Sequence, residues 1–153
     1  MRNAGFTLIE LLIALAIMAI ITAVALPLYN QFTDRAFRSE AQADLLDCAQ
    51  ALERFASISF SYENASDTDA DGIGDDDGPG PIASQICTPG SAAAGRYAFT
   101  VVGSATAFTL TADPQGSLAD DGLMTYNSVG VRGWDQNGDD DTTDADEQTW
   151  EEG

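Results

Sequence analysis

An apolar run near the N-terminus constrains this chain more than any other feature. From Leu11 to Leu28, eighteen residues, only Thr22 and Pro27 are not apolar, and one charge, Glu10, stands just before the run. That length is at the lower end of what crosses a bilayer as an α-helix. The run is a signal peptide, a membrane anchor or another kind of apolar helix, and each reading has to account for the carboxylate.

The leader in front of the run favours one of these readings. A secretory signal peptide places its small-residue cleavage site after its apolar region. Here the small-residue site, Ala4-Gly5, precedes the run, and Arg2 is the only charge in the leader. Cleavage after Gly5 leaves the apolar run on the mature chain, which then begins at Phe6.

Helical periodicity continues beyond the apolar run. Apolar residues recur at spacings of three and four, which places them on one stripe of an α-helix. The sequence predicts one helix from about residue 6 to about residue 57, roughly 75 Å long, with an apolar front half and an amphipathic rear half. Pro27 is expected to kink or locally melt it, since proline removes a backbone donor and clashes with the preceding turn. The stripe consists of Phe37, Ala41, Leu45, Cys48, Leu52 and Phe55.

The N-terminal residues GFTLIELLIALAIMAIITAVALPLYNQF resemble those of type IV pilins and of type II secretion pseudopilins. The resemblance implies that a prepilin peptidase cuts between Gly5 and Phe6, that the Phe6 amine is methylated, and that Pro27 is the family's helix-breaking proline. It implies storage in the bacterial inner membrane, followed by extraction by the pilus assembly machinery into a helical homo-oligomeric filament on the cell surface, whose core is made of these helices.

Glu10 has two readings. With Thr7 it forms an S/T-x-x-E capping box, which satisfies amides at the helix start. In the filament reading, which the family resemblance favours, it pairs with the Phe6 amine of a neighbouring subunit, because a charge in apolar surroundings is costly unless paired and usually marks function.

Composition limits the function classes. The 153 residues carry 25 Asp and Glu against six Arg, no Lys and no His, for a net charge of −19. Such a chain repels nucleic-acid phosphates, so its charge argues against DNA as a partner and favours cations. The absence of His, Lys and any nucleophile or phosphate-loop motif argues against an enzyme. Sixteen of the acids lie in two blocks, residues 63–78 and 134–153.

Residues 58–95 are rich in Ser, Asp, Gly and Pro and read as a long loop, which needs something to hold it. A filament subunit matures outside the cytoplasm, where disulfides persist, so we expect Cys48 and Cys87 to be joined. The alternative is a buried free thiol at Cys48.

Calcium is the second candidate for holding this loop. Residues 67–75 read D-x-D-x-D-G-I-x-D, in which alternate carboxylates converge on a hard cation and the glycine permits the sharp turn. The pattern resembles calcium loops of the EF-hand and of thrombospondin type 3 repeats. Gly78 replaces the expected acid at position twelve, and Asp76 or Asp77 could substitute. The alternative is a solvated acidic linker. The predicted ligands are Asp67, Asp69, Asp71, the carbonyl of Ile73, and Asp75.

Strand patterns follow the loop. Apolar and more polar residues alternate along residues 96–102 and 107–112, as in β-strands with one buried face. The apolar face consists of Tyr97, Phe99 and Val101 in the first strand and of Phe108, Leu110 and Ala112 in the second. Residues 123–127 predict a third strand, and 129–131 a short fourth. The expected fold is α+β, with a three- or four-stranded antiparallel meander covering helix residues 35–57.

The head sequence RYAFTVVGSATAFTLTADPQGSLADDGLMTYNSVGVRG resembles a minor pilin branch with a TLTAxPQG pattern. That branch often closes its C-terminal loop with cysteines, where this chain has Asp121, Gly122 and Thr149. A second calcium loop is expected to replace that closure, bracketed by Trp134 and Trp150. The alternative is an acidic solubilising tail, and Asp140 stands where glycine is expected. The predicted ligands are Asp135, Asn137, Asp139, Asp141 and Asp146.

The sequence thus predicts a structural subunit of a type IV pilus-like filament with a calcium-stabilised head. The alternatives are a major pseudopilin of a type II secretion system, or a minor pilin acting as a binding or DNA-uptake module. The expected organisation is a leader (1–5), a membrane and filament-core helix (6–30) and a head (31–153); the head comprises helix 31–57, loop 58–95, meander 96–133 and acidic loop 134–153.

Overall fold

The computed structural model describes residues 7–151. The chain divides into two units, residues 1–36 and 37–153. One helix, α1 (Leu8–Ser59), runs from the first unit into the second. The predicted cleavage site, Gly5 and Phe6, lies outside the described residues.

The part of α1 in the first unit is a single apolar helix. An eighteen-residue window in α1 has a mean hydropathy of 2.8, high enough to cross a membrane, and none of that window is buried by the rest of the chain. The helix runs unbroken through Pro27, so local melting, one of the two expected effects of this proline, is wrong, while a kink stays a prediction.

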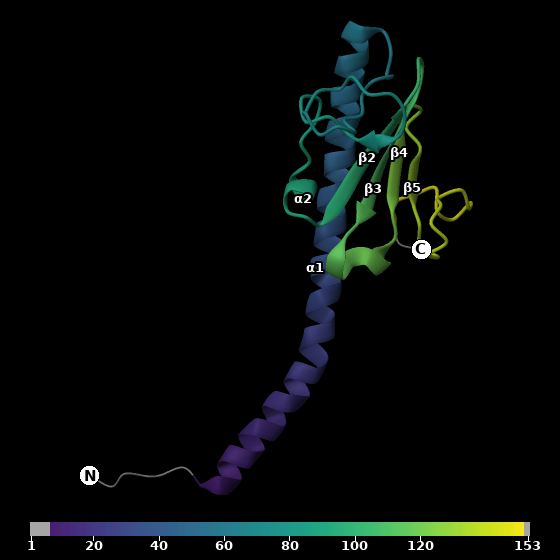
Figure 1. Cartoon of the computed structure of the whole chain (residues 1–153). Coiled ribbons are helices and arrows are strands. Elements are labelled where there is room, and N and C mark those ends of the chain that lie inside the picture. Colours follow the sequence, from purple (N-terminus) through teal and green to yellow (C-terminus); the bar gives the residue numbers. More distant parts are fainter. Residues whose placement is uncertain (1–6, 152–153) are drawn as a thin grey trace. The chain divides into compact units, whose positions relative to one another are not determined.

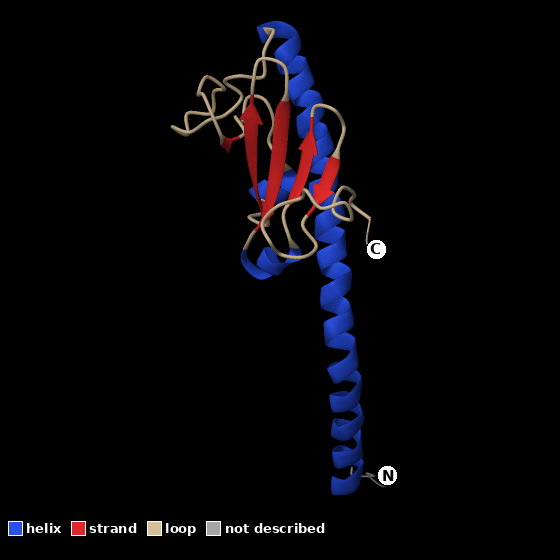
Figure 2. Cartoon of the chain, turned by 90° about the vertical axis from the view of Figure 1, so that its right-hand side faces the viewer, coloured by secondary structure: helices blue, strands red, loops and turns tan. Residues whose placement is uncertain are grey.

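The second unit is an α+β domain, as expected, in which one sheet packs on the amphipathic half of α1 (Figure 2). The sheet has five antiparallel strands in the order β1-β2-β3-β4-β5, one more than the most we expected. Figure 1 labels β2 to β5. The strands are β1 (Gly80–Pro81), β2 (Tyr97–Gly103), β3 (Phe108–Pro114), β4 (Met124–Asn127) and β5 (Arg132–Trp134).

Two short elements complete the domain: helix α2 (Gly90–Ala93) and the 3-10 helix η1 (Gly116–Asp121). The predicted long loop therefore contains both β1 and α2. The last strand begins at Arg132 rather than at Val129, which is 84% exposed in the turn before it.

The core forms where the predicted apolar faces meet. The inward residues of β2 and β3 are all buried, and so are Ala41, Leu45, Cys48 and Leu52 of the α1 stripe. Phe37 and Phe55, at the ends of the stripe, are partly buried against the same cluster. Burying these faces provides the main driving force for folding.

Candidate functional site: two acidic loops and their attachments

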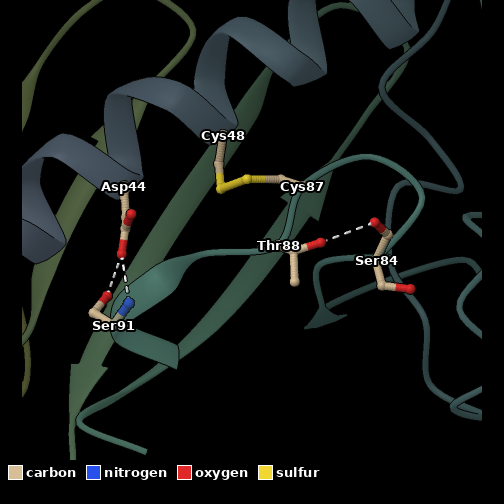
Figure 3. The surroundings of a disulfide bond; sticks show 6 residues. All are labelled: Asp44, Cys48, Ser84, Cys87, Thr88 and Ser91. Carbon is tan, nitrogen blue, oxygen red and sulfur yellow. Dashed lines mark hydrogen bonds between the residues drawn. A yellow bond between two sulfur atoms is a disulfide. The ribbon is translucent and has the colours of Figure 1, made fainter. Parts of the chain in front are cut away.

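The predicted disulfide is present and ties α1 to the long loop. Cys48 and Cys87 are joined, with a Cα–Cα distance of 5.3 Å across 39 residues of sequence (Figure 3). Beside it, the Asp44 carboxylate accepts a hydrogen bond from the backbone N–H of Ser91 at 2.8 Å and another from its hydroxyl. In the chain-entropy account, a loop of this length stabilises the fold by about 3–4 kcal/mol.

The first acidic loop, residues 67–76, curls around its own carboxylates. Asp67 Oδ2 accepts the N–H of Gly72 at 2.9 Å, and Asp71 Oδ1 accepts that of Ile73 at 2.8 Å. Carboxylate oxygens of Asp67, Asp69 and Asp76 lie within 4.8 Å of one another. The structure thus brings two predicted ligands together with Asp76, while Asp71 and Asp75 lie outside this group.

Hydrogen bonds explain why Asp76 closes the loop. Its Oδ2 accepts the Thr68 hydroxyl at 2.8 Å and the backbone N–H groups of Thr68 and Asp69 at 2.6 and 3.3 Å. These bonds, led by the hydroxyl, lower the pKa of Asp76. The pKa of Asp75 is raised instead, by desolvation and then by the negative charges of neighbouring carboxylates.

The C-terminal acidic loop, residues 135–147, repeats this design. Asp135 Oδ2 accepts the N–H of the residue five positions on, Asp140, at 3.1 Å, as Asp67 does with Gly72. Glu147 Oε1 accepts the N–H groups of Gln136 and Asn137 at 3.2 and 3.3 Å, as Asp76 does with the corresponding pair.

Backbone conformation matches as well. Gly72 has φ +89° and Asp140 has φ +66°, at equivalent positions of the two loops. Position six therefore needs the left-handed conformation in both loops, and Asp140 adopts it at the place where a glycine was expected. Aspartate tolerates this conformation better than most residues.

Carboxylate oxygens of Asp135, Asp139 and Glu147 lie within 4.8 Å of one another. The first two were predicted ligands, whereas Glu147 was missed. The predicted Asp141 uses its carboxylate to accept the N–H and hydroxyl of Thr143 at 2.7 and 2.8 Å, which lowers its pKa. The other two predicted ligands also lie outside this group of three carboxylates. Asp146 is exposed. The Oδ1 of Asn137 accepts the N–H of Asp139. An acid one position beyond the EF-hand spacing was the signal available for Glu147.

Both tryptophans anchor the C-terminal loop, as their positions had indicated. Trp134, 7% exposed, donates its indole N–H to the Asp121 carbonyl at 2.7 Å. Trp150 donates to the Gly133 carbonyl at 3.0 Å and packs on Tyr126, with ring centroids 5.9 Å apart. The loop is therefore anchored on η1 at its start and on β4 and β5 at its end.

At the start of α1, the capping box is formed. Glu10 Oε2 accepts the N–H and the hydroxyl of Thr7 at 2.9 and 2.8 Å, and Thr7 Oγ1 accepts the N–H of Glu10 at 3.3 Å. The carboxylate thus satisfies the helix start within a single chain. Pairing with a neighbouring amine requires a second subunit.

Comparison with known proteins identifies the class. A profile described as the prokaryotic N-terminal methylation motif matches residues 1–26. Pilins with this motif are structural proteins, not enzymes, and their N-terminal helix anchors them in the membrane before assembly into extracellular pili. A second profile, "Type IV minor pilin ComP, DNA uptake sequence receptor", matches residues 27–125, well over half of the chain. The chain belongs to this family of type IV minor pilins.

Individual relatives are similar to this chain over only part of their length. The chain is 41% identical to the type IV major pilin protein PilA of Myxococcus xanthus over 63 residues, 41% of this chain and 29% of the relative. It is 44% identical to a fimbrial protein of Moraxella nonliquefaciens over 71 residues, 45% of each chain. It is 62% identical to PilE1 of Neisseria gonorrhoeae over 37 residues, 24% of this chain and 22% of the relative. The chain thus spans less than half of the length of these relatives, and no solved structure matches it significantly.

Proposed function

We propose that this chain is a structural subunit of a type IV pilus-like filament, which it enters by polymerising through its N-terminal helix. The observation that carries the proposal is the exposure of that helix: every residue from Thr7 to Phe32 is exposed within the single chain. Apolar surface left in water costs about 25 cal/mol per Å². Lipid first, and then the same helices of neighbouring subunits, supply the missing cover.

Processing fits the same proposal. Membership of the methylation-motif family implies cleavage by a prepilin peptidase and handling by the pilus assembly machinery. In the filament, Glu10 exchanges its bonds to Thr7 for the amine of a neighbouring Phe6. This exchange pairs the carboxylate, which the filament core would bury, with a positive charge.

Calcium is proposed as the cofactor that holds the head's two acidic loops. Carboxylate triads and the shared loop backbone support this role, because hard cations are bound by converging oxygens on such turns. The remaining predicted ligands, Asp71, Ile73, Asp75, Asn137, Asp141 and Asp146, stay predictions. Chelation with EDTA is expected to lower the Tm of the purified chain, and an unchanged Tm would contradict the role.

Glu10 is tested best against its capping partner. Glu10→Gln removes the charge, whereas Thr7→Ala removes only the capping hydroxyl. We expect electron microscopy of sheared cell surfaces to show filaments lost in the first variant and retained in the second, at matched subunit levels in the membrane. Wild-type filament yield from Glu10→Gln would refute the assembly role, and equal losses in both variants would reduce Glu10 to a helix cap.

The minor pilin family favours a second possibility, in which the chain is a scarce component of filaments built mainly from another subunit. Immunogold labelling distinguishes the two: labelling along whole filaments supports a major subunit, and sparse labelling supports a minor one. A short periplasmic filament would instead indicate the pseudopilin of a secretion system.

DNA binding by this chain is disfavoured on charge. The head is strongly acidic, Arg38 is paired with Asp121, and Arg96 is paired with Glu40. A DNA receptor needs cations that are free to displace counterions from phosphates. We expect no gel shift of duplex DNA at physiological salt.

A further inference from the structure

Glu147 is the most deeply buried carboxylate of the C-terminal loop. Only 1% of the residue is exposed, and its Oε2 has no hydrogen-bond partner among residues 7–151, although Oε1 accepts two backbone N–H groups. An unpaired carboxylate oxygen removed from water is strongly unfavourable. A buried group of this kind calls for a ligand that supplies positive charge.

The residues around Glu147 indicate that the ligand is a cation. Asp135, 3% exposed, and Asp139 bring carboxylate oxygens within 4.8 Å of Glu147 and of each other. Three carboxylates this close repel one another, whereas a single cation between them converts the repulsion into attraction. We propose that residues 135–147 bind one calcium ion and that Glu147 is its buried anchoring ligand. This deepens the calcium role proposed above and rests on it.

The donor set selects calcium. Every candidate ligand is oxygen, the chain has no histidine, and both cysteines are in the disulfide. Oxygen-only sites favour hard cations over transition metals. Calcium accepts six to eight oxygens in a flexible arrangement, whereas magnesium demands a strict octahedron and gives up its water reluctantly. An irregular loop of this kind therefore suits calcium better.

The ion would be coupled to the sheet edge. The backbone carbonyl of Glu147 accepts the N–H of Trp134 at 2.8 Å, and Asp135 directly follows that tryptophan and donates its N–H to the Leu123 carbonyl at 2.9 Å. Trp150 holds the other end of the loop. These are the only two tryptophans in the sequence, so intrinsic fluorescence reports on this loop and not on residues 67–76.

The test uses the full mature chain in detergent micelles. Calcium chloride is titrated while tryptophan emission and calorimetric heat are followed, in wild type, in Glu147→Gln and in the matched control Glu151→Gln. Glu151 lies in the same acidic block, residues 134–153, but outside the loop 135–147, and is exposed. We expect a saturable fluorescence change in wild type and in the control, and an affinity at least about tenfold weaker in Glu147→Gln, because affinity follows the charge count of the ligands.

A folding control separates ligation from packing. Glutamine keeps the side-chain oxygen that accepts the N–H groups of Gln136 and Asn137 but removes the buried charge. In EDTA, Glu147→Gln should melt at or above the wild-type temperature, whereas in calcium it should melt below it. A purely structural Glu147 would lower the melting temperature equally in both conditions, and that result would overturn the proposal.

Other results would overturn it as directly. These are wild-type calcium affinity in Glu147→Gln, no fluorescence response in wild type, or magnesium binding as tightly as calcium. Asp76→Asn, in the first loop, should leave the tryptophan signal unchanged. Failure here leaves filament membership untouched, because that depends on the N-terminal part of α1 and is read by microscopy of the Glu10 variant.

Discussion

The guanidinium of Arg38 lies over the indole ring of Trp134, 3.9 Å from its centroid. The same guanidinium pairs with the carboxylate of Asp121, with Nε 3.0 Å from Oδ2, and the Asp121 carbonyl accepts the Trp134 indole N–H. This arrangement joins α1 to η1 and β5 through a cation, a carboxylate and an indole ring, and we call it the polar clamp.

Breaking this clamp should destabilise the head. The side chains of Arg38 and Asp121 are 11% and 13% exposed, so Arg38→Met leaves a largely buried carboxylate without this cation, while the long hydrogen bond from the Tyr97 hydroxyl, at 3.4 Å, remains. We expect a loss of about 3 kcal/mol in the free energy of unfolding, measured by urea denaturation. Arg96→Met is the control: its partner Glu40 is 42% exposed, so its loss should cost less than about 1 kcal/mol. Equal effects of the two variants would contradict the clamp.

Gly122 should be intolerant of a side chain. It has φ +78°, and a Cβ built on it would lie 1.7 Å from the Asp135 carbonyl oxygen. Gly116 has a similar φ of +65° but no atom near its Cβ position. Alanine at 116 should cost about 1–2 kcal/mol for its backbone conformation alone. Alanine at 122 should cost at least about 2 kcal/mol more, for the clash and because φ +78° with ψ +143° is a conformation close to the region that only glycine adopts. Thermal unfolding of both variants checks this difference, and equal losses in the two variants would contradict the contact between residues 122 and 135.

The lowered pKa of Asp76 predicts a pH dependence. Its folded pKa lies below the unfolded value, so the group stabilises the fold above the unfolded pKa, and this contribution is lost as pH falls through the folded pKa. Thr68→Val removes the leading hydrogen bond and should raise the Asp76 pKa, so the loss begins at higher pH. Carboxyl NMR titration in EDTA measures the shift. Thr68→Ser should keep the wild-type pKa, and an unshifted pKa in the valine variant would contradict the assignment.

Much of the fold could be predicted because its signals are periodic. The Phe37–Phe55 stripe and the alternation around Phe99 and Leu110 each report a buried face, and the structure buries them. β1 could not be predicted, because Gly80–Pro81 has no pattern of its own and pairs only through backbone register with Thr100 and Val101. The last strand was predicted too early because Val129 and Val131 are apolar. Val129 lies instead in a turn, in which the side chain of Asn127 accepts the N–H groups of Val129 and Val131.

The acidic loops show the same division. Alternating aspartates located both loops, because alternate positions of a curling chain converge. The position of the last acid in each loop depends instead on how many residues the loop needs to bring the chain back to its first aspartate. This number differs between the loop that ends at Asp76 and the loop that ends at Glu147. Glu147 lies one position beyond the expected spacing, so spacing gave only a weak signal for it, and its burial is what supports its proposed role.

The filament proposal is tested most directly by the intact mass of this chain in filaments sheared from the cell surface. We predict a chain that begins at Phe6, carries one added methyl group and has lost two hydrogens to the Cys48–Cys87 bond. Absence of the chain from such filaments, or a chain there that retains residues 1–5, would contradict it.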